Sequence, residues 1–167
     1  KSVRMEKLKV LVVDDEPGIR SGINRILRNY SVGFPFMEED FHFDLIDAET
    51  GEKAIEIIES SPVDIMLLDN KLPGINGIDV LEYISKQKYD VQVMMITSYA
   101  SLDLAVKATN IGAYNFIPKP FTPDELKTAM EGITKHLFLK RMTRQLHKEG
   151  KQIRFQFLSV LSHELKS

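Results

Sequence analysis

Four apolar stretches of the chain each end in, or are followed by, a polar side chain that can take part in phosphoryl chemistry. These side chains are three consecutive acids, a single acid, a threonine and a lysine, namely Asp14, Asp15, Glu16, Asp69, Thr97 and Lys119. If the stretches are parallel β-strands, their carboxyl ends meet at one edge of the sheet and these side chains lie together. Carboxylates crowded there repel one another, and Mg²⁺, which prefers oxygen ligands, would neutralise them.

The set meets the requirements of phosphoryl transfer to a carboxylate. An acid beside a divalent ion, here Asp69, can accept the group because the ion offsets charge on the phosphoryl oxygens. Lys119 would neutralise a second oxygen, and Thr97 would hydrogen bond to the third. Each residue alone has an ordinary structural explanation, such as helix capping for the acids or packing for the threonine. Their ordered placement after successive apolar stretches favours the phospho-acceptor hypothesis.

The elements that must position these residues follow from the hydrophobic pattern. Apolar stretches without alternation predict strands buried on both faces. We expect strands over residues 8–13, 43–47, 65–68, 91–97 and 113–117, and helices near 17–29, 50–60, 76–87 and 101–110. A fifth helix begins after Phe121, where Thr122 can cap it and Pro123 can fill its first position. The predicted fold class is α/β, a doubly wound five-stranded parallel sheet.

The connection over residues 29–42 is long for this architecture. It holds Phe34, Pro35, Phe36 and Phe41. We expect a helix extension and a loop that pack on the body through these aromatic side chains. The alternative is a patch that binds a partner.

From Pro123 onward no further proline occurs, and the helical pattern runs to the end of the chain. A broken heptad of apolar residues predicts a coiled coil with a second copy of the chain, and hence a homodimer. These residues are Leu126, Met130, Ile133, Leu137, Leu139, Met142, Leu146, Ile153, Phe157 and Val160. We therefore divide the chain into a body over residues 1–122, a fifth helix continuing as a coiled-coil linker over 123–156, and a terminal segment over 157–167.

Four motifs give the body a family resemblance. They are Val12-Val13-Asp14-Asp15-Glu16, Leu67-Leu68-Asp69-Asn70-Lys71-Leu72-Pro73-Gly74, Ile96-Thr97-Ser98 and Phe116-Ile117-Pro118-Lys119-Pro120-Phe121. Over residues 6–137 the chain resembles response-regulator receiver domains, which have a flavodoxin-like fold. The resemblance implies that Asp69 is phosphorylated by a histidine kinase or a phosphotransfer protein. It also implies that Thr97 and Phe116 are paired switch residues and that the Lys119-Pro120 peptide bond is cis.

The same resemblance implies a ligand set for Mg²⁺ around Asp69. Asp15 would bind the ion directly, Asp14 mainly through water, and the backbone carbonyl of Lys71 would complete the protein ligands. Lys71 and Tyr99 stand at two positions that tune dephosphorylation in the family. Because Tyr99 is bulky and would obstruct the attacking water, we expect slow loss of the phosphoryl group.

The terminal segment carries a second candidate phospho-acceptor. Glu164 follows His163 directly, so a carboxylate can orient the imidazole and accept its proton. Residues 157–167 resemble the phospho-acceptor box on the dimerisation helix of sensor histidine kinases. By this resemblance His163 is the phosphorylated histidine and Glu164 its base for autophosphorylation. The family's ATP-binding domain does not follow in this sequence, so we expect ATP to be used only by a longer parent chain.

Composition limits the other functional classes. The chain has no cysteine, which fits a reducing cytoplasm, and no apolar run near the roughly 20 residues of a membrane span. The basic residues over 140–154 are spread between apolar positions, which is typical of a solvated helix face rather than a nucleic-acid site. A phosphohydrolase would want an acid where Lys71 stands. A receiver module that dimerises without phosphorylation is the remaining alternative, which the complete acidic set disfavours.

Overall fold

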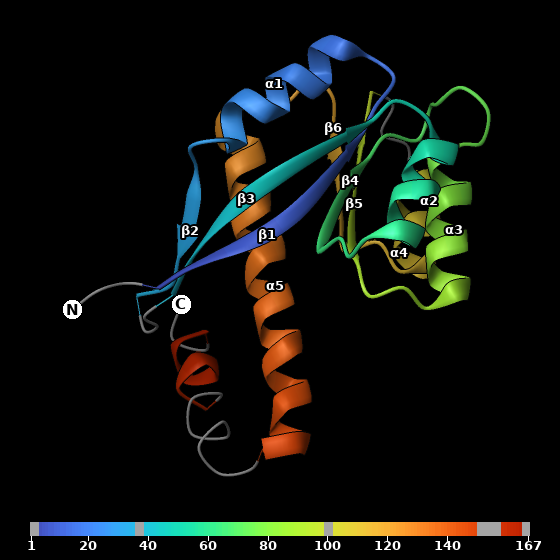
Figure 1. Cartoon of the computed structure of the whole chain (residues 1–167). Coiled ribbons are helices and arrows are strands. Elements are labelled where there is room, and N and C mark those ends of the chain that lie inside the picture. Colours follow the sequence, from blue (N-terminus) through green and yellow to red (C-terminus); the bar gives the residue numbers. More distant parts are fainter. Residues whose placement is uncertain (1–3, 36–38, 99–101, 150–157, 165–167) are drawn as a thin grey trace.

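The computed structural model describes residues 4–35, 39–98, 102–149 and 158–164. Its strands are β1 (Arg4–Val13), β2 (Ser31–Gly33), β3 (Glu39–Ala48), β4 (Ile65–Leu68), β5 (Gln92–Thr97) and β6 (Asn115–Pro118). Its helices are α1 (Pro17–Leu27), α2 (Gly51–Ser60), α3 (Gly77–Gln87), α4 (Leu102–Ile111) and α5 (Pro123–Glu149). The strands form one sheet in the order β2-β3-β1-β4-β5-β6 (Figure 1). The α/β prediction is confirmed.

Helices cover both faces of this sheet. One core cluster joins the strands to α1 and α5, and a second joins them to α2, α3 and α4. Every residue of β4 and β5 is buried, as expected for strands that lack alternation. The sheet is therefore doubly wound, and its carboxyl edge lies open where the strands lead into the loops.

The prediction of five parallel strands is wrong in one respect. The connection between α1 and β3 contains a sixth strand, β2, which pairs antiparallel with β3 at the edge of the sheet. The aromatic side chains of this region do pack on the body, since Phe34 and Phe41 are both 6% exposed and both rings contact Phe138 of α5. Phe36 lies outside the described residues. Pairing with β3 gives the backbone of β2 hydrogen bonds that a loop could not supply.

Strands β1 and β3 are longer than predicted. They pair over ten residues each, from Arg4 and Glu39 onward, whereas β4 pairs only with the last four residues of β1. The amino-terminal halves of β1 and β3 therefore extend past the central strands. Helix α5 passes across this extension (Figure 1).

Helix α5 begins as the sequence predicts. Thr122 accepts a hydrogen bond from the backbone of Glu125, and the Glu125 carboxylate accepts one from the Thr122 backbone. The first part of the apolar stripe is buried against the chain's own sheet, with exposures of 1% or less at Leu126, Met130, Ile133 and Leu137. Within the described residues, this part of the stripe is covered without a second copy of the chain.

The prediction of one helix running to the end of the chain is wrong. Residues 158–164 are helical, and the Glu164 carboxylate lies 2.9 Å from Lys135 Nζ on α5. In one unbroken helix these residues would be roughly 43 Å apart along the axis. Val160 is fully buried. The terminal segment therefore packs back on α5 of the same chain. The coiled coil with a second copy of the chain remains a prediction. Ile153 and Phe157 lie outside the described residues.

Candidate functional site

Two buried acids lie side by side at the carboxyl edge of the sheet. The Asp69 backbone N–H donates to the carbonyl of Val13, and that of Asp14 donates to the carbonyl of Ala48, at 3.0 and 3.1 Å. These bonds continue the strand pairing one residue past the strand ends, so they fix both backbones. Asp14 is 2% exposed and Asp69 is 3% exposed. The sheet thus buries two carboxylates that are far apart in sequence.

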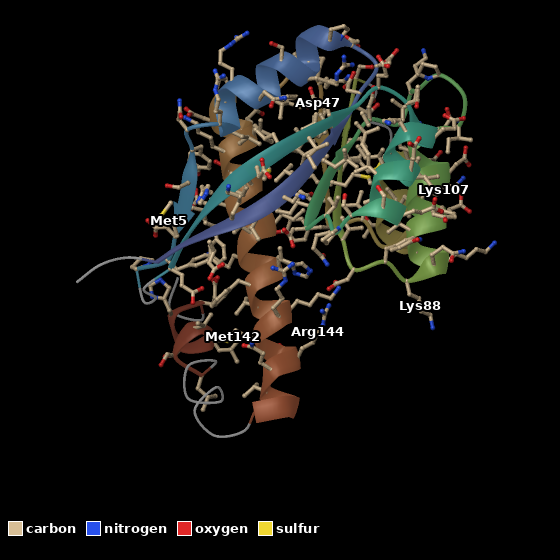
Figure 2. The ribbon with its side chains drawn as sticks, in the orientation of Figure 1. Met5, Asp47, Lys88, Lys107, Met142 and Arg144 are labelled. Carbon is tan, nitrogen blue, oxygen red and sulfur yellow. The ribbon has the colours of Figure 1, made fainter. Side chains whose placement is uncertain are left out.

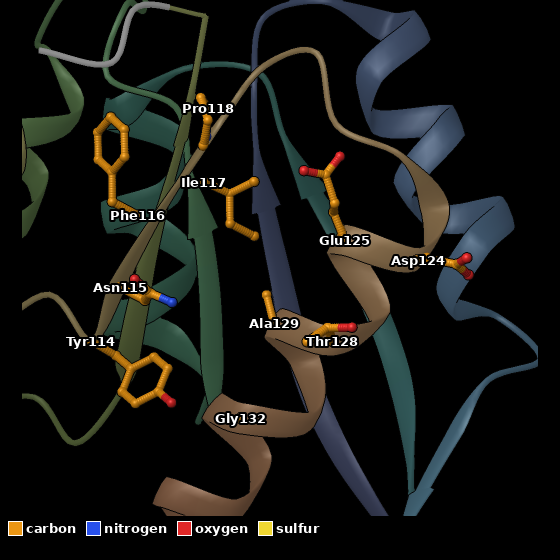
Figure 3. A pocket seen from close by; sticks show the side chains of 10 residues that line it. All are labelled: Tyr114, Asn115, Phe116, Ile117, Pro118, Asp124, Glu125, Thr128, Ala129 and Gly132. Carbon is orange, nitrogen blue, oxygen red and sulfur yellow. The ribbon is translucent and has the colours of Figure 1, made fainter.

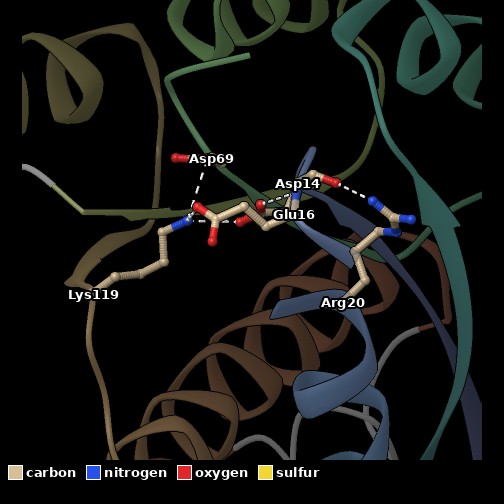
Figure 4. Close-up of polar contacts among 5 residues, drawn as sticks. All are labelled: Asp14, Glu16, Arg20, Asp69 and Lys119. Atoms are coloured by element: carbon tan, nitrogen blue, oxygen red, sulfur yellow. Dashed lines mark hydrogen bonds and ion pairs between the residues drawn. The ribbon is translucent and has the colours of Figure 1, made fainter. Parts of the chain in front are cut away.

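Lys119 lies between these carboxylates (Figure 4). Its Nζ is 2.9 Å from Asp14 Oδ2, 3.3 Å from Asp69 Oδ2 and 3.6 Å from Glu16 Oε1. Its backbone N–H donates to the carbonyl of Thr97 at 2.7 Å, which ties the loop after β6 to the end of β5. The Lys119-Pro120 peptide bond is cis, as the family resemblance implied. The structure therefore brings together four of the polar residues selected from the sequence, Asp14, Glu16, Asp69 and Lys119.

Burial and the charge of the opposite partner shift the pKa values of Asp69 and Lys119 in opposite directions. Burial raises the pKa of Asp69, Lys119 lowers it, and Asp14 raises it further, so that the result is a raised pKa. Burial lowers the pKa of Lys119, but its hydrogen bond and charge contact with Asp14 and then Asp69 outweigh this, and the pKa is raised. The lysine is therefore held in its charged form.

The donor atoms here fit a magnesium ion. Single ligand oxygens of Asp14, Asp15 and Glu16 lie within 4.8 Å of one another. Asp69 Oδ1 is buried and has no hydrogen-bond partner among the described parts of the chain, so it has an oxygen lone pair to offer. An all-oxygen set is what Mg²⁺ prefers. The sequence analysis did not include Glu16 in the ligand set, although it lies directly after the other two acids.

Lys71 contacts the site through its backbone. The backbone of Lys71 contributes to lowering the pKa of the Asp69 carboxyl, against the larger effect of burial. The role predicted for the Lys71 carbonyl as a metal ligand remains a prediction. Tyr99, the residue expected to slow dephosphorylation, lies outside the described residues.

The two predicted switch residues lie on neighbouring strands. Thr97 ends β5 and is 2% exposed. Phe116 lies on β6 and packs, partly buried, against the core cluster on the α2–α4 face. Figure 3 shows Phe116 and Ile117 on opposite sides of β6, with a cavity of about 490 Å³ between β6 and α5. Their roles as a switch remain predictions.

Sequence reasoning missed two residues that fix the Asp69 loop. Asn70 accepts hydrogen bonds from Gly77 N–H through its carbonyl, at 2.8 Å, and from Ile78 N–H through its side chain, at 3.1 Å. A Cβ on Gly77 would lie 2.3 Å from the carbonyl oxygen of Asp69. The Asn76-Gly77 pair is a turn signal in the sequence, but nothing in the sequence shows that this glycine touches the backbone of Asp69.

The second candidate acceptor lies away from this edge. His163 is exposed, and Glu164 forms the ion pair with Lys135 of α5. Helix α5 starts beside the carboxyl edge and runs back along the sheet, so Lys135 lies well toward the amino ends of the strands. Figure 1 shows the terminal helical segment, in red, near the amino ends of β1 and β3. The structure does not bring His163 to Asp69.

The doubly wound sheet and its acidic carboxyl edge define a receiver-type α/β domain. The response regulator receiver domain model matches residues 10–131, and the chain belongs to this family. Receiver domains accept phosphate from histidine kinases and typically bind Mg²⁺ at an acidic pocket. No helix among the described residues is long and apolar enough to cross a membrane.

Among similar proteins, the sporulation initiation phosphotransferase F of Bacillus subtilis is 32% identical over 132 residues, covering 79% of this chain and 95% of that protein. The response regulator protein PilR of Pseudomonas aeruginosa is 34% identical over 116 residues, covering 70% of this chain but 24% of PilR. The signal receiver domain of a putative Luxo repressor protein from Vibrio parahaemolyticus superposes with a TM-score of 0.74 at 29% identity, covering 87% of this chain and 100% of that one. The chain thus matches nearly the whole length of the first of these relatives and about a quarter of the length of the second.

Proposed function

We propose that the chain is the phospho-accepting module of a two-component pathway and that Asp69 takes the phosphoryl group from a histidine kinase or a phosphotransfer protein. The observation that supports this most directly is the buried Oδ1 of Asp69, which has no hydrogen-bond partner among the described residues, in an acid whose other oxygen contacts Lys119. A buried carboxylate oxygen without a partner is costly. Its presence favours a role in chemistry over a role in stability.

Three side chains have separate roles in the phosphoryl transfer. An Asp69 carboxylate oxygen attacks phosphorus, the bond to the donor breaks, and the donor leaves with its electron pair. Lys119 Nζ, which already contacts the Asp69 carboxylate, donates to a phosphoryl oxygen, and the Thr97 hydroxyl donates to another. Mg²⁺, held by Asp14, Asp15, Asp69 and the Lys71 carbonyl, would supply positive charge that offsets the charge of the phosphoryl oxygens.

Mass spectrometry tests this proposal. The wild-type chain is incubated with acetyl phosphate and Mg²⁺ and its intact mass is measured, with EDTA as the metal-free control. We expect one phosphoryl group per chain, lost in Asp69→Asn and retained in Asp44→Asn, which changes an exposed acid on the same sheet. Phosphorylation of the Asp69→Asn variant would contradict the assignment. Absence of phosphorylation in the wild type would favour the alternative, a receiver module that acts without phosphorylation.

We further propose that this receiver regulates a histidine-kinase segment that carries His163. The supporting observation is the contact between the two parts, in which Val160 is fully buried and Glu164 is paired with Lys135. If Glu164 is the base for His163, this ion pair withholds it from that role. Phosphorylation of Asp69 would move Thr97 and Phe116 and, through α5, release the segment for dimerisation with a second copy.

Cysteine crosslinking with a short bismaleimide tests the release, because two long side chains separate the backbones and a direct disulfide needs Cβ atoms about 3.5–4.5 Å apart. The chain has no cysteine of its own, so Lys135→Cys with Glu164→Cys reports on this contact alone. We expect rapid crosslinking within one chain without phosphodonor, and slower crosslinking once Asp69 is phosphorylated. The control pair is Glu59→Cys with Tyr83→Cys, which joins α2 to α3 through a side-chain contact and should not respond. If phosphorylation of Asp69 left the crosslinking rate of the Lys135→Cys/Glu164→Cys pair unchanged, regulation through this contact would be contradicted. Light scattering on the same samples measures dimerisation.

A further inference from the structure

Arg20 has no role in the account above, although its guanidinium lies beside the acidic site. The side chain is only 17% exposed. Its Nη1 donates to the backbone carbonyl of Asp14 at 2.7 Å, and its Nε lies 3.8 Å from Asp47 Oδ2 (Figure 4 shows the contact with Asp14). An arginine fork that reaches two acceptors on different elements holds them in a fixed relation.

The second acceptor, Asp47, which lies near the end of β3 beside α1 (Figure 2), is itself held in place. Asn24, one turn along α1 from Arg20, donates its side-chain amide to Asp47 Oδ1 at 3.0 Å and to the Arg20 carbonyl at 2.8 Å. Asp47 directly precedes Ala48, whose carbonyl accepts the Asp14 N–H. Arg20 therefore binds the backbone carbonyl of Asp14 directly. Through Asp47 it also stabilises the end of β3, whose Ala48 carbonyl accepts the backbone N–H of Asp14.

The orientation of Asp14 decides where the neighbouring acids lie. Its carboxylate accepts the Glu16 backbone N–H at 2.9 Å through Oδ1 and contacts Lys119 through Oδ2. The carbonyl that Arg20 binds belongs to the peptide leading into Asp15. A rotation of this peptide would move the side chains of Asp15 and Glu16 away from the edge where Asp69 lies.

We propose that Arg20 is a positioning residue for the magnesium site: it fixes the peptide after Asp14 and so holds the three acids in a geometry that binds the ion. This inference rests on the metal-dependent function proposed above. Groups outside the ligand shell that orient ligands typically change metal affinity by about 10- to 100-fold when they are removed.

The charge of Arg20 and its contacts have opposite effects on Mg²⁺ affinity. Whether removal of Arg20 weakens or tightens Mg²⁺ binding therefore distinguishes the two. As a nearby cation, Arg20 repels Mg²⁺, and its removal alone would tighten metal binding. As a positioning group, it favours binding, and its removal would weaken it. Asp47 offsets the charge of Arg20, and physiological salt screens much of what remains. We therefore expect the positioning effect to dominate.

Calorimetric titration with Mg²⁺ alone tests the proposal. We expect Arg20→Gln to raise the Mg²⁺ dissociation constant about 10-fold, and Arg20→Lys to raise it less, since an ammonium group keeps the charge but lacks the fork. Arg25→Gln removes the same charge from an exposed position on α1 and should change the constant less than about twofold. Asp47→Asn, which weakens the same contact from the other side, provides a second measurement if Arg20→Gln does not fold.

A metal-free measurement separates positioning from general stability. In EDTA, amide hydrogen exchange at Glu16 should be faster in Arg20→Gln, because its N–H bond to Asp14 loosens, while exchange at Met66 in β4 stays unchanged. Equal or tighter Mg²⁺ binding by Arg20→Gln would overturn the proposal, as would a fall in melting temperature with an unchanged dissociation constant. If the wild type binds no Mg²⁺, the magnesium site itself fails, and that result is distinct from failure of Arg20 alone.

Discussion

Gly77 offers the sharpest test of how the fold positions the acceptor. A Cβ at this position would lie 2.3 Å from the Asp69 carbonyl oxygen and 2.8 Å from Asn70 Cα, both backbone atoms that cannot rotate away. Ordinary contacts of a Cβ begin at 3.4 Å, so Gly77→Ala must push the Asp69 backbone by about 1 Å or move α3 by as much.

This displacement should lower both the free energy of unfolding and the rate at which Asp69 is phosphorylated. Overpacking of this kind costs about 1–3 kcal/mol. Gly77 is the first residue of α3 and not an interior one, so the better helix propensity of alanine returns little of this cost, and we expect a net loss of about 1–3 kcal/mol. A misplacement of about 1 Å at a reacting group lowers rates by about 100-fold. The phosphorylation rate of Asp69 with acetyl phosphate and Mg²⁺ should therefore fall far more than the stability loss alone would explain.

The matched control is Gly22→Ala on α1. A Cβ at Gly22 has no atom within 4 Å, so this variant should gain up to about 1 kcal/mol and phosphorylate at the wild-type rate. Urea unfolding and time-resolved intact mass provide the two measurements. A Gly77→Ala protein with wild-type stability and rate would refute the conclusion that the β4–α3 backbone holds Asp69 by close contact.

Three further predictions concern charge and packing. Burial raises the pKa of Asp69, so its ionised form destabilises the fold. Asp69→Asn in EDTA should therefore be more stable than the wild type at neutral pH, and the difference should vanish as the pH falls below the ordinary value of 3.8. An equal difference at both pH values would contradict this. The hydrogen bond from Arg144 lowers the pKa of Asp90, so this ion pair stabilises the fold above the ordinary Asp pKa and its contribution is lost in acid. Both side chains are about half exposed, so Arg144→Ala should lower the free energy of unfolding by only about 0.5 kcal/mol at neutral pH, measured by chemical denaturation. Phe138→Ala removes a ring that contacts two aromatic side chains near β2 and should cost about 2–3 kcal/mol; a loss below about 1 kcal/mol would show that α5 does not depend on this contact.

The central strands and the start of α5 were predictable because their signals are local. Residues 65–68 and 92–97 are continuously apolar or nearly so, and only strands buried on both faces suit such stretches. The Thr122-Pro123-Asp124-Glu125 start was equally clear, and the structure shows the reciprocal hydrogen bonds between Thr122 and Glu125. Strand β2 was not predictable, because three residues, Ser-Val-Gly, carry no periodic signal and become a strand only by pairing with β3.

The direction of the terminal segment was also beyond the sequence. The apolar spacing along α5 is compatible with a partner helix or with a sheet, since both need one buried face. The structure shows that the chain's own sheet covers the first part of this face, and that the ion pair between Lys135 and Glu164 joins the segment to α5.

For this protein, the sequence by itself determined the order of the five parallel strands and of the helices between them. It also determined the acids, the threonine and the lysine that end or follow these strands, because hydrophobic pattern and residue chemistry are properties of short stretches. The tertiary structure alone decided which of these groups touch: Lys119 between Asp14 and Asp69, Gly77 against the Asp69 backbone, Arg20 on the peptide after Asp14. These contacts join residues separated by up to 105 positions. Their distances depend on how the strands pair and how the helices pack, which no local pattern specifies.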